Sequence, residues 1–346
     1  MQASYRDTPW QRFDAFDLEG AARRIEGRVV ATPLLALPCS DPRLDVRGKL
    51  ENRQATGSFK ARGALNNILA LSAEERARGV VAASSGNHGK ALAWAARQAG
   101  VAATIVMPKD AYPNKIEACR AEGAEVVLSE TRGGADELTA RFVAEGRVLV
   151  HPYDRRGTIE GAGTVGLELA RAWPEVEVVI ACVGGGGLAA GTSLGLRRAL
   201  GRRVRVFGSE PIGAPTMTLG LARGAPVTVT NITTGVQGLC PPYSGALNID
   251  VCRATLDGML TPDDAEILAA QRLLVRPDPA RGWAGEVVEP AGAAAYAAAL
   301  TAPLIRDLLE GRSAADPLRV AVTVSGGNPD PAQLAWARES EGSHAG

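Results

Sequence analysis

The chain has 346 residues, of which 46% are hydrophobic and 22% are charged, and its 38 basic residues balance 38 acidic ones. This length exceeds that of one ordinary compact core, so we expect two domains, or one large domain with an inserted lobe. The composition is that of a globular protein and excludes a disordered or fibrous one. The balanced charge, without long runs of one sign, argues against nucleic acid or a membrane surface as a partner.

The cysteines and the N-terminal segment bear on the compartment. Five cysteines are scattered along the chain, with neither the spacing of a disulfide framework nor that of a metal site. The first residues lack the basic and then apolar pattern of a signal peptide, and no window approaches the ~20 apolar residues of a membrane span. We therefore expect reduced thiols and a cytoplasmic location.

From about residue 61 onward, short β-rich runs alternate with helical stretches rich in alanine and leucine, a rhythm typical of βαβ units. The first series contains four predicted strands, at residues 80–84, 101–107, 124–129 and 147–151. Each predicted helix between them ends at a glycine, namely Gly100, Gly123 and Gly146. These units predict a small parallel sheet.

A second series predicts a larger sheet, with strands at residues 176–183, 203–209 and 317–324 and helices at residues 164–173 and 188–200. The strands are nearly continuous apolar runs, as in parallel strands covered on both faces. We therefore predict an α/β protein with two open, twisted, mostly parallel sheets flanked by helices. The expected division is a large domain of residues 1–79 and 150–335, an inserted small domain of residues 80–149, and a disordered tail of residues 336–346.

Ligands of open α/β sheets collect at the carboxyl ends of strands, where helix N-termini present free N–H groups. One such junction offers backbone donors and hydroxyls to a carboxylate, although a helix cap would look the same; it consists of Ser84, Ser85, Gly86, Asn87 and His88. A second is typical of a phosphate cradle, because consecutive glycines let the backbone approach an anion; it consists of Gly184, Gly185, Gly186, Gly187 and Leu188.

Lys60 ends a polar stretch, residues 51–60, that leads into a predicted helix. A single lysine is nearly always a solvated surface residue. Together with a phosphate cradle and a carboxylate cradle, however, a candidate amine nucleophile completes the parts that an amino-acid enzyme with a Schiff-base cofactor needs.

Seven segments, in this order, resemble the serine/threonine dehydratase family of fold-type II pyridoxal-phosphate enzymes, which also includes the serine racemases. They are residues 49–64, 84–96, 115–128, 151–169, 183–188, 288–295 and 325–328. The resemblance implies a fold like that of the tryptophan synthase β subunit, pyridoxal 5'-phosphate as cofactor, a small amino acid as substrate, and a homodimer.

The resemblance also implies roles for single residues. Lys60 holds the cofactor as a Schiff base and removes the Cα proton of the substrate, with Phe59 beside the ring. The remaining cofactor contacts fall to Asn87 at the ring hydroxyl, Ser325 at the pyridine nitrogen, Gly235 through its backbone, and residues 184–188 at the phosphate. Residues 84–88 bind the substrate carboxylate. The implied reaction removes water and then ammonia from a small β-hydroxy L-amino acid and yields a 2-oxo acid.

Two departures from the family pattern limit these expectations. Residues 233–235 are Thr-Thr-Gly where many relatives have Ala-Asp-Gly, so the pocket for the substrate side chain is expected to differ. Glu210 matches a ligand of cation-binding relatives, but Thr216 stands where they have an aspartate, so we expect no metal.

Ser85 leaves the reaction type open. Many dehydratases have alanine at this position, whereas serine racemases have a serine that protonates the face opposite the lysine. The first alternative is therefore an amino-acid racemase that uses Lys60 and Ser85 on opposite faces of the substrate. The others are a β-replacement enzyme and a non-catalytic protein that binds the cofactor.

Overall fold

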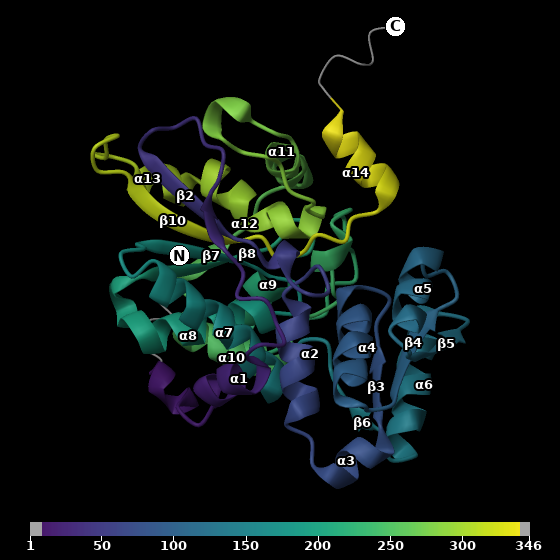
Figure 1. Ribbon diagram of the computed structural model, residues 1–346. Coiled ribbons are helices and arrows are strands. Elements are labelled where there is room, and N and C mark those ends of the chain that lie inside the picture. Colours follow the sequence, from purple (N-terminus) through teal and green to yellow (C-terminus); the bar gives the residue numbers. More distant parts are fainter. Residues whose placement is uncertain (1–8, 340–346) are drawn as a thin grey trace, which may run out of the picture.

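The computed structural model describes residues 9–339 and contains two sheets (Figure 1). The larger sheet has the strand order β1-β2-β10-β7-β8-β9, and only β1 is antiparallel to its neighbour. Its strands are β1 (Leu34–Ala36), β2 (Leu44–Lys49), β10 (Leu318–Thr323), β7 (Val178–Cys182), β8 (Arg205–Ser209) and β9 (Gly258–Leu260). The smaller sheet is wholly parallel. In order across the sheet, its strands are β5 (Glu125–Ser129), β4 (Ala103–Pro108), β3 (Val80–Ala83) and β6 (Val148–Leu149).

Helices cover both faces of the larger sheet. Because successive side chains of a strand point to opposite faces, Val178 and Ile180 of β7 belong to one core and Val179 and Ala181 to another. The core that contains Val179 is covered by α7 (Arg156–Ala172), α8 (Gly187–Leu200), α9 (Thr216–Arg223) and α10 (Ala246–Thr255), with α1 (Leu18–Ile25) packed against α7. The opposite core is covered by α11 (Asp264–Val275), α12 (Pro290–Thr301), α13 (Pro303–Leu308) and α14 (Pro331–Arg338).

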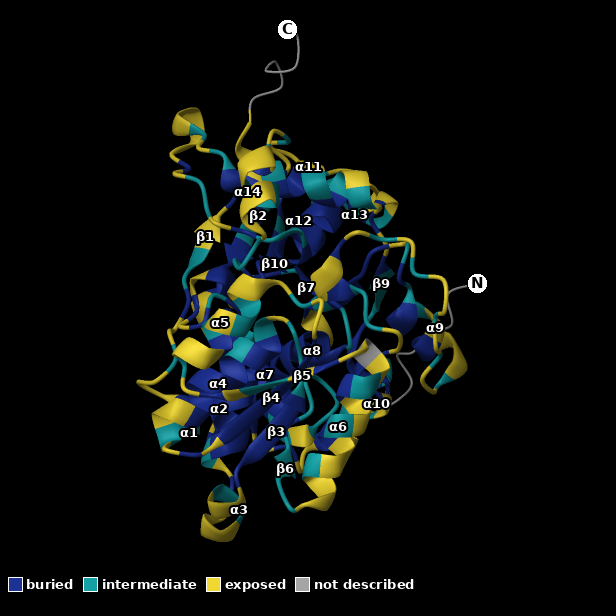
Figure 2. Cartoon of the chain, turned by 90° about the vertical axis from the view of Figure 1, so that its right-hand side faces the viewer, coloured by how far each residue is buried: buried dark blue, intermediate teal, exposed yellow. Residues whose placement is uncertain are grey.

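The smaller sheet also lies between two helical layers. On one side, α6 (Arg132–Ala144) packs Ala135 against Val81 and Val106. On the other side lie α4 (Asn87–Ala99), α5 (Pro113–Ala121) and α2 (Lys60–Leu69). The short α3 (Ala73–Arg78) has no buried residue, and Figure 2 shows it as an exposed projection.

Helix α2 joins the two parts of the molecule, because it packs against α4 on one side and α7 on the other (Figure 1). All four strands of the smaller sheet come from residues 80–149, but Leu65 and Ile68 of α2 belong to the same core as those strands. The division of the chain at residues 79/80 and 149/150 therefore remains a proposal. Within residues 9–339 we find no helix long and apolar enough to cross a membrane.

The α/β class with two mostly parallel sheets is confirmed, and several element ends match the sequence pattern. Helix α4 ends where expected, because Gly100 adopts the left-handed conformation at φ 65°. The tail begins later than expected, since α14 continues to Arg338 and buries Ala337. The rest of that expected tail, residues 340–346, lies outside the described residues.

Helix α7 differs most from the sequence prediction, because it begins at Arg156 rather than near residue 164. Glycine lowers helix propensity, so the glycine-rich start was not predicted as helix. Tertiary packing explains why this glycine-rich segment is nevertheless helical. A Cβ at Gly161 would lie 2.6 Å from the carbonyl oxygen of Arg62, and one at Gly191 of α8 would lie 2.4 Å from that of Ile159. These glycines let α7 approach α2 and α8 closely.

This packing predicts that Gly166→Ala, in the middle of α7, destabilises the protein. An added Cβ would lie 2.2 Å from the carbonyl oxygen of Thr192 in α8. We expect a loss of about 1–3 kcal/mol in the free energy of unfolding, measured by chemical denaturation. Gly133→Ala in α6 is the matched control, because a Cβ there meets no atom within 4 Å. It should leave stability unchanged or raise it by up to ~1 kcal/mol. Equal stability of the two variants would contradict the close approach of α7 and α8.

Candidate active site

The segments singled out from the sequence meet between the two sheets, at the carboxyl ends of their strands. The loop after β3 begins at Ser84, the loop after β7 contains Gly184, and the loop after β10 contains Ser325. Hydrogen bonds tie the Lys60 segment to the last of these, since the Phe59 N–H donates to the Ser325 carbonyl at 3.1 Å. The structure therefore brings together segments that lie up to about 270 residues apart in the chain.

Lys60 is the first residue of α2, and its side chain is half-buried. The Nζ atom donates to the carbonyl oxygen of Pro152 at 2.6 Å and lies 5.0 Å from the centre of the Phe59 ring. Burial lowers the pKa of the amine to about 8, because the charged form loses hydration. A fraction of Lys60 is therefore uncharged near neutral pH, as an amine nucleophile or base requires.

The loop of residues 84–88 leads from β3 into α4. The Ser84 hydroxyl accepts from the Gly89 N–H at 3.1 Å, so this side chain caps the helix. His88 points inward, with Nε2 2.8 Å from the Val150 carbonyl oxygen, and burial lowers its pKa to about 3. His88 can therefore offer only its backbone N–H to a substrate carboxylate. Ser85 and Gly86 keep part of their surface accessible.

The Asn87 side chain already has two partners. Its Nδ2 donates to Glu289 Oε1 at 2.6 Å, and its Oδ1 accepts from Asn328 Nδ2 at 2.8 Å. Burial raises the pKa of the Glu289 carboxyl, an effect that nearby Lys115 opposes. These contacts fix the orientation of the Asn87 amide at the edge of the site.

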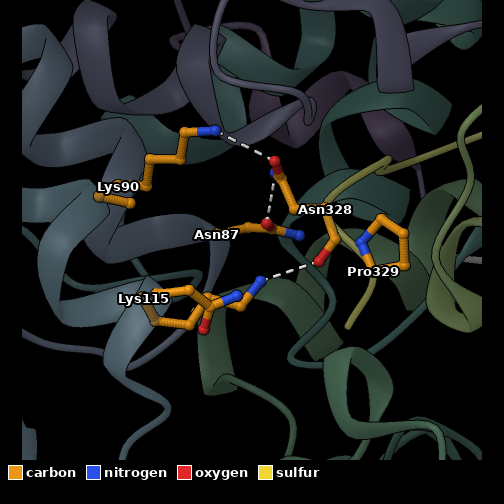
Figure 3. A pocket seen from close by; sticks show the side chains of 8 residues that line it. Asn87, Lys90, Lys115, Asn328 and Pro329 are labelled. Atoms are coloured by element: carbon orange, nitrogen blue, oxygen red, sulfur yellow. Dashed lines mark hydrogen bonds between the residues drawn. The ribbon is translucent and has the colours of Figure 1, made fainter. Parts of the chain in front are cut away.

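A pocket of about 170 Å³ lies beside Asn87 and is lined by residues of α4, α5 and the loop after β10. Figure 3 shows the side chains that line it. Two lysines bridge its walls. Lys90 Nζ donates to Asn328 Oδ1 at 3.1 Å, and Lys115 Nζ donates to the Asn328 carbonyl oxygen at 2.8 Å. Asn328 thus links the smaller sheet's helices to the larger sheet.

The glycine loop of residues 184–187 connects β7 to α8. Gly186 caps the helix at φ 97°, in the left-handed region. The Gly185 carbonyl accepts from Asn248 Nδ2 at 2.7 Å and from the Gly245 N–H at 3.1 Å. The first N–H groups of α8 have no partner inside the helix and lie at its positive end, so this backbone is suited to bind a phosphate.

The Tyr153 ring lies directly against the glycine loop. A Cβ at Gly185 would come within 2.2 Å of the ring, so no larger residue fits there. The ring also packs edge-to-face with His151, with ring centroids 4.6 Å apart. The Tyr153 ring therefore forms one wall of the glycine loop.

Ser325 and Gly235 occupy different environments. Ser325 is buried, and its hydroxyl donates weakly to the Ala291 carbonyl at 3.3 Å. The Gly235 N–H donates to Asp264 Oδ2 at 2.7 Å, and its carbonyl accepts from the Gln237 N–H at 2.9 Å. The Gly235 N–H is thus engaged within the protein, whereas its carbonyl oxygen has a second lone pair that can accept from a ligand.

The Glu210 carboxylate serves as a cap for α9. It accepts from the N–H groups of Met217 and Thr218 at 2.9 and 2.8 Å and from the Thr218 hydroxyl. Burial raises the pKa of Glu210 to about 7. The Thr216 hydroxyl lies 3.0 Å from that of Ser244. Within residues 9–339, no group of three or more His, Cys, Asp or Glu side chains could hold a metal ion.

Sequence reasoning assigned no role to several residues that the structure places in the site: Pro152, Tyr153, Glu289 and Asn328. All four lie in segments that carried the family resemblance. Their partners are remote in sequence, so only the resemblance could have singled them out.

Comparisons with known proteins agree with this geometry. The model of the family "Pyridoxal-phosphate dependent enzyme" matches residues 25–326. The chain is 38% identical to the L-threonine ammonia-lyase of Thermotoga maritima, over 91% of this chain and 75% of that enzyme. It is 37% identical to the phenylserine dehydratase of Ralstonia pickettii, over 75% of this chain and 81% of that enzyme. The structure of maize serine racemase superposes with a TM-score of 0.82 at 32% identity, covering 93% of this chain and 95% of the racemase. The chain therefore belongs to the pyridoxal-phosphate dependent enzymes.

Proposed function

We propose that the protein is a pyridoxal 5'-phosphate-dependent dehydratase, which converts a small β-hydroxy L-amino acid to a 2-oxo acid and ammonium. Serine, threonine and their analogues are the proposed substrates. The observation that carries this proposal is the Lys60 amine, which is held by a peptide carbonyl and has a pKa lowered to about 8 by burial. The ammonia-lyases and dehydratases among the relatives support the same reaction.

The residues of the site fit the cofactor. The N–H groups of residues 184–188 would hold the phosphate, and Asn87, oriented by Glu289 and Asn328, would bind the ring hydroxyl. When bound, pyridoxal phosphate supplies an electron sink that makes the Cα proton of an amino acid acidic. Ser325 would offer a neutral hydroxyl to the ring nitrogen, which cannot stabilise a positive charge there as an aspartate would. We expect this to favour elimination over transamination.

Two groups would act on the substrate itself. The N–H groups at the start of α4, from Asn87 and His88, would hold the carboxylate at the positive end of the helix. The Lys60 amine would remove the Cα proton, because an amine with a pKa near 8 is partly uncharged at neutral pH yet remains basic. The β-hydroxyl would then leave with its bonding electrons and take up a proton to become water. Hydrolysis of the released enamine by a second water molecule would give the 2-oxo acid and ammonium.

A racemase is the second candidate, favoured by Ser85 and by relatives. The chain is 33% identical to serine racemase of Oryza sativa over 92% of its length. In this case Ser85 would exchange a proton on the face opposite Lys60.

We further propose that the protein is a cytoplasmic homodimer that binds no nucleic acid and needs no metal.

The test of the main proposal is Lys60→Ala. We expect this variant to lose the visible absorbance of the bound cofactor and to lower the rate of 2-oxo acid formation by at least about a hundredfold, because the amine both anchors the cofactor and transfers the proton. Circular dichroism and the melting temperature should be retained. Lys109→Ala, at an exposed site, is the control. Turnover in Lys60→Ala comparable to that of the control would refute the proposal.

Ser85→Ala separates the two candidate functions. If the enzyme is mainly a dehydratase, the variant should retain elimination from the L-substrate and lose only side racemisation, because the hydroxyl leaves before the opposite face is protonated. Oxo acid release and chiral chromatography measure the two reactions. If L-substrate elimination collapses while the cofactor stays bound, Ser85 is essential to the main path and the dehydratase interpretation of this residue fails.

Chelator treatment should leave the rate of 2-oxo acid formation unchanged. The Glu210 carboxylate already accepts hydrogen bonds from two N–H groups and a hydroxyl of α9, and a hard cation needs several oxygen ligands. The rate is measured before and after dialysis against a chelator, with added magnesium or calcium as the control. A large loss that either cation restores would show that residues 210–216 bind a metal.

A further inference from the structure

A cluster of buried charges surrounds Arg62, two residues after Lys60. The side chains of Arg62 and Glu51 are fully buried. Arg62 makes two forked ion pairs: Nε and Nη2 donate to the two oxygens of Glu51, both at 2.8 Å, and Nη1 and Nη2 donate to those of Glu168 at 2.5 and 2.9 Å. Lys49 also donates to Glu168, at 2.6 Å. Two positive and two negative charges thus balance.

The cluster lies on the side of α2 away from the candidate active site. Residues two apart in an α-helix point about 200° apart around its axis. The Lys60 amine accordingly reaches Pro152, whereas the Arg62 guanidinium reaches Glu51, just beyond β2, and Glu168 on α7. The first turn of α2 is therefore held from both sides.

The geometry of the cluster resists movement of this turn. A forked pair fixes the plane of a guanidinium as well as its position, and Arg62 makes two. Any sliding or rotation of α2 would break the hydrogen bonds from Arg62 to Glu51 and to Glu168 at the same time. It would also leave buried charges unpaired. A buried ion pair seldom adds net stability over apolar packing. The Arg62 cluster therefore contributes mainly by fixing the position of α2.

We infer that Arg62 is a positioning residue for Lys60, which holds the first turn of α2 so that the amine stays buried and aimed at the cofactor. This inference rests on the proposed role of Lys60. Arg62 touches neither substrate nor cofactor in this assignment. Its effect would pass through the backbone of one helical turn, from residue 62 to residue 60.

The test compares Arg62→Lys with Arg197→Lys. Both replace a buried arginine by a residue of the same charge that cannot make forked pairs. Arg197 lies in α8, and its partners are Asp257 and the carbonyls of Thr255 and Val204, all outside the candidate site. We expect both variants to lower the melting temperature. Only Arg62→Lys should also change the chemistry of Lys60.

Two readouts report on Lys60. The first readout uses the full chain freed of cofactor and an amine-directed reagent. Mass spectrometry measures the rate at which the reagent labels Lys60 at different pH values. In the parent protein this rate should have its midpoint near pH 8. In Arg62→Lys the midpoint should rise by at least half a pH unit, because an amine that shifts toward water regains hydration. In the loaded enzyme, kcat should fall about tenfold or more, with a smaller change in KM, because proton transfer depends on the position of the amine.

Glu51→Gln is the second variant, in case Arg62→Lys does not fold. It removes the negative charge of Glu51 and one of the two oxygens that accept from Arg62. It should raise the labelling midpoint of Lys60 and lower kcat, each by less than Arg62→Lys does. Equal labelling midpoints and equal kcat in Arg62→Lys and Arg197→Lys would overturn the positioning role and leave Arg62 a stabilising residue only. Failure of the proposed function would look different, because Lys60→Ala would then retain cofactor absorbance and turnover.

Discussion

A lysine amine taken out of water without a carboxylate partner loses part of its preference for the charged form. Lys60 is in this position among residues 9–339. Its Nζ atom donates to a peptide carbonyl, and burial is the cause of its lowered pKa. The amine can keep this state only if the surrounding segments hold it there. The packing of α2 and the loops that meet at its start provide this restraint.

Three kinds of contact hold the start of α2. Backbone hydrogen bonds join residues 57–59 to the loop after β10. Close glycine contacts bring α7 against the helix, since Gly63 and Gly161 leave no room for side chains between them. The ion cluster around Arg62 holds the far face. Each restrains the helix at a different point, and together they define the direction of the Lys60 side chain.

The same loops give the site its anion-binding character. Helices α4 and α8 both begin there, so their unpaired N–H groups and positive ends face the same region. The phosphate and the carboxylate of the proposed reaction would thus be bound with few charged side chains. This suits an amine whose reactivity depends on a weakly charged environment. Asn328 contacts Asn87, Lys90 and Lys115, and so joins the helices of the smaller sheet to the site.

The sequence by itself determined the alternation of strands and helices, the two sheets, and the helix ends at glycines, because these depend on local periodicity and on backbone freedom. The glycine loop and the loop of residues 84–88 could also be singled out because they stand at strand ends. They and the Lys60 segment lie in patterns that resemble a known family. Tertiary structure decided the rest. Residues 156–163 are helical, and their glycines allow the close contact with α2 and α8 that stabilises this helix. His88 points into the core, the Gly235 N–H donates to Asp264, and Asn87 donates to Glu289. These contacts could not be predicted from local sequence, because each partner lies far away in the chain. Local sequence patterns cannot predict which remote groups will meet, because these contacts depend on how the whole chain buries its apolar surface and pairs its polar groups.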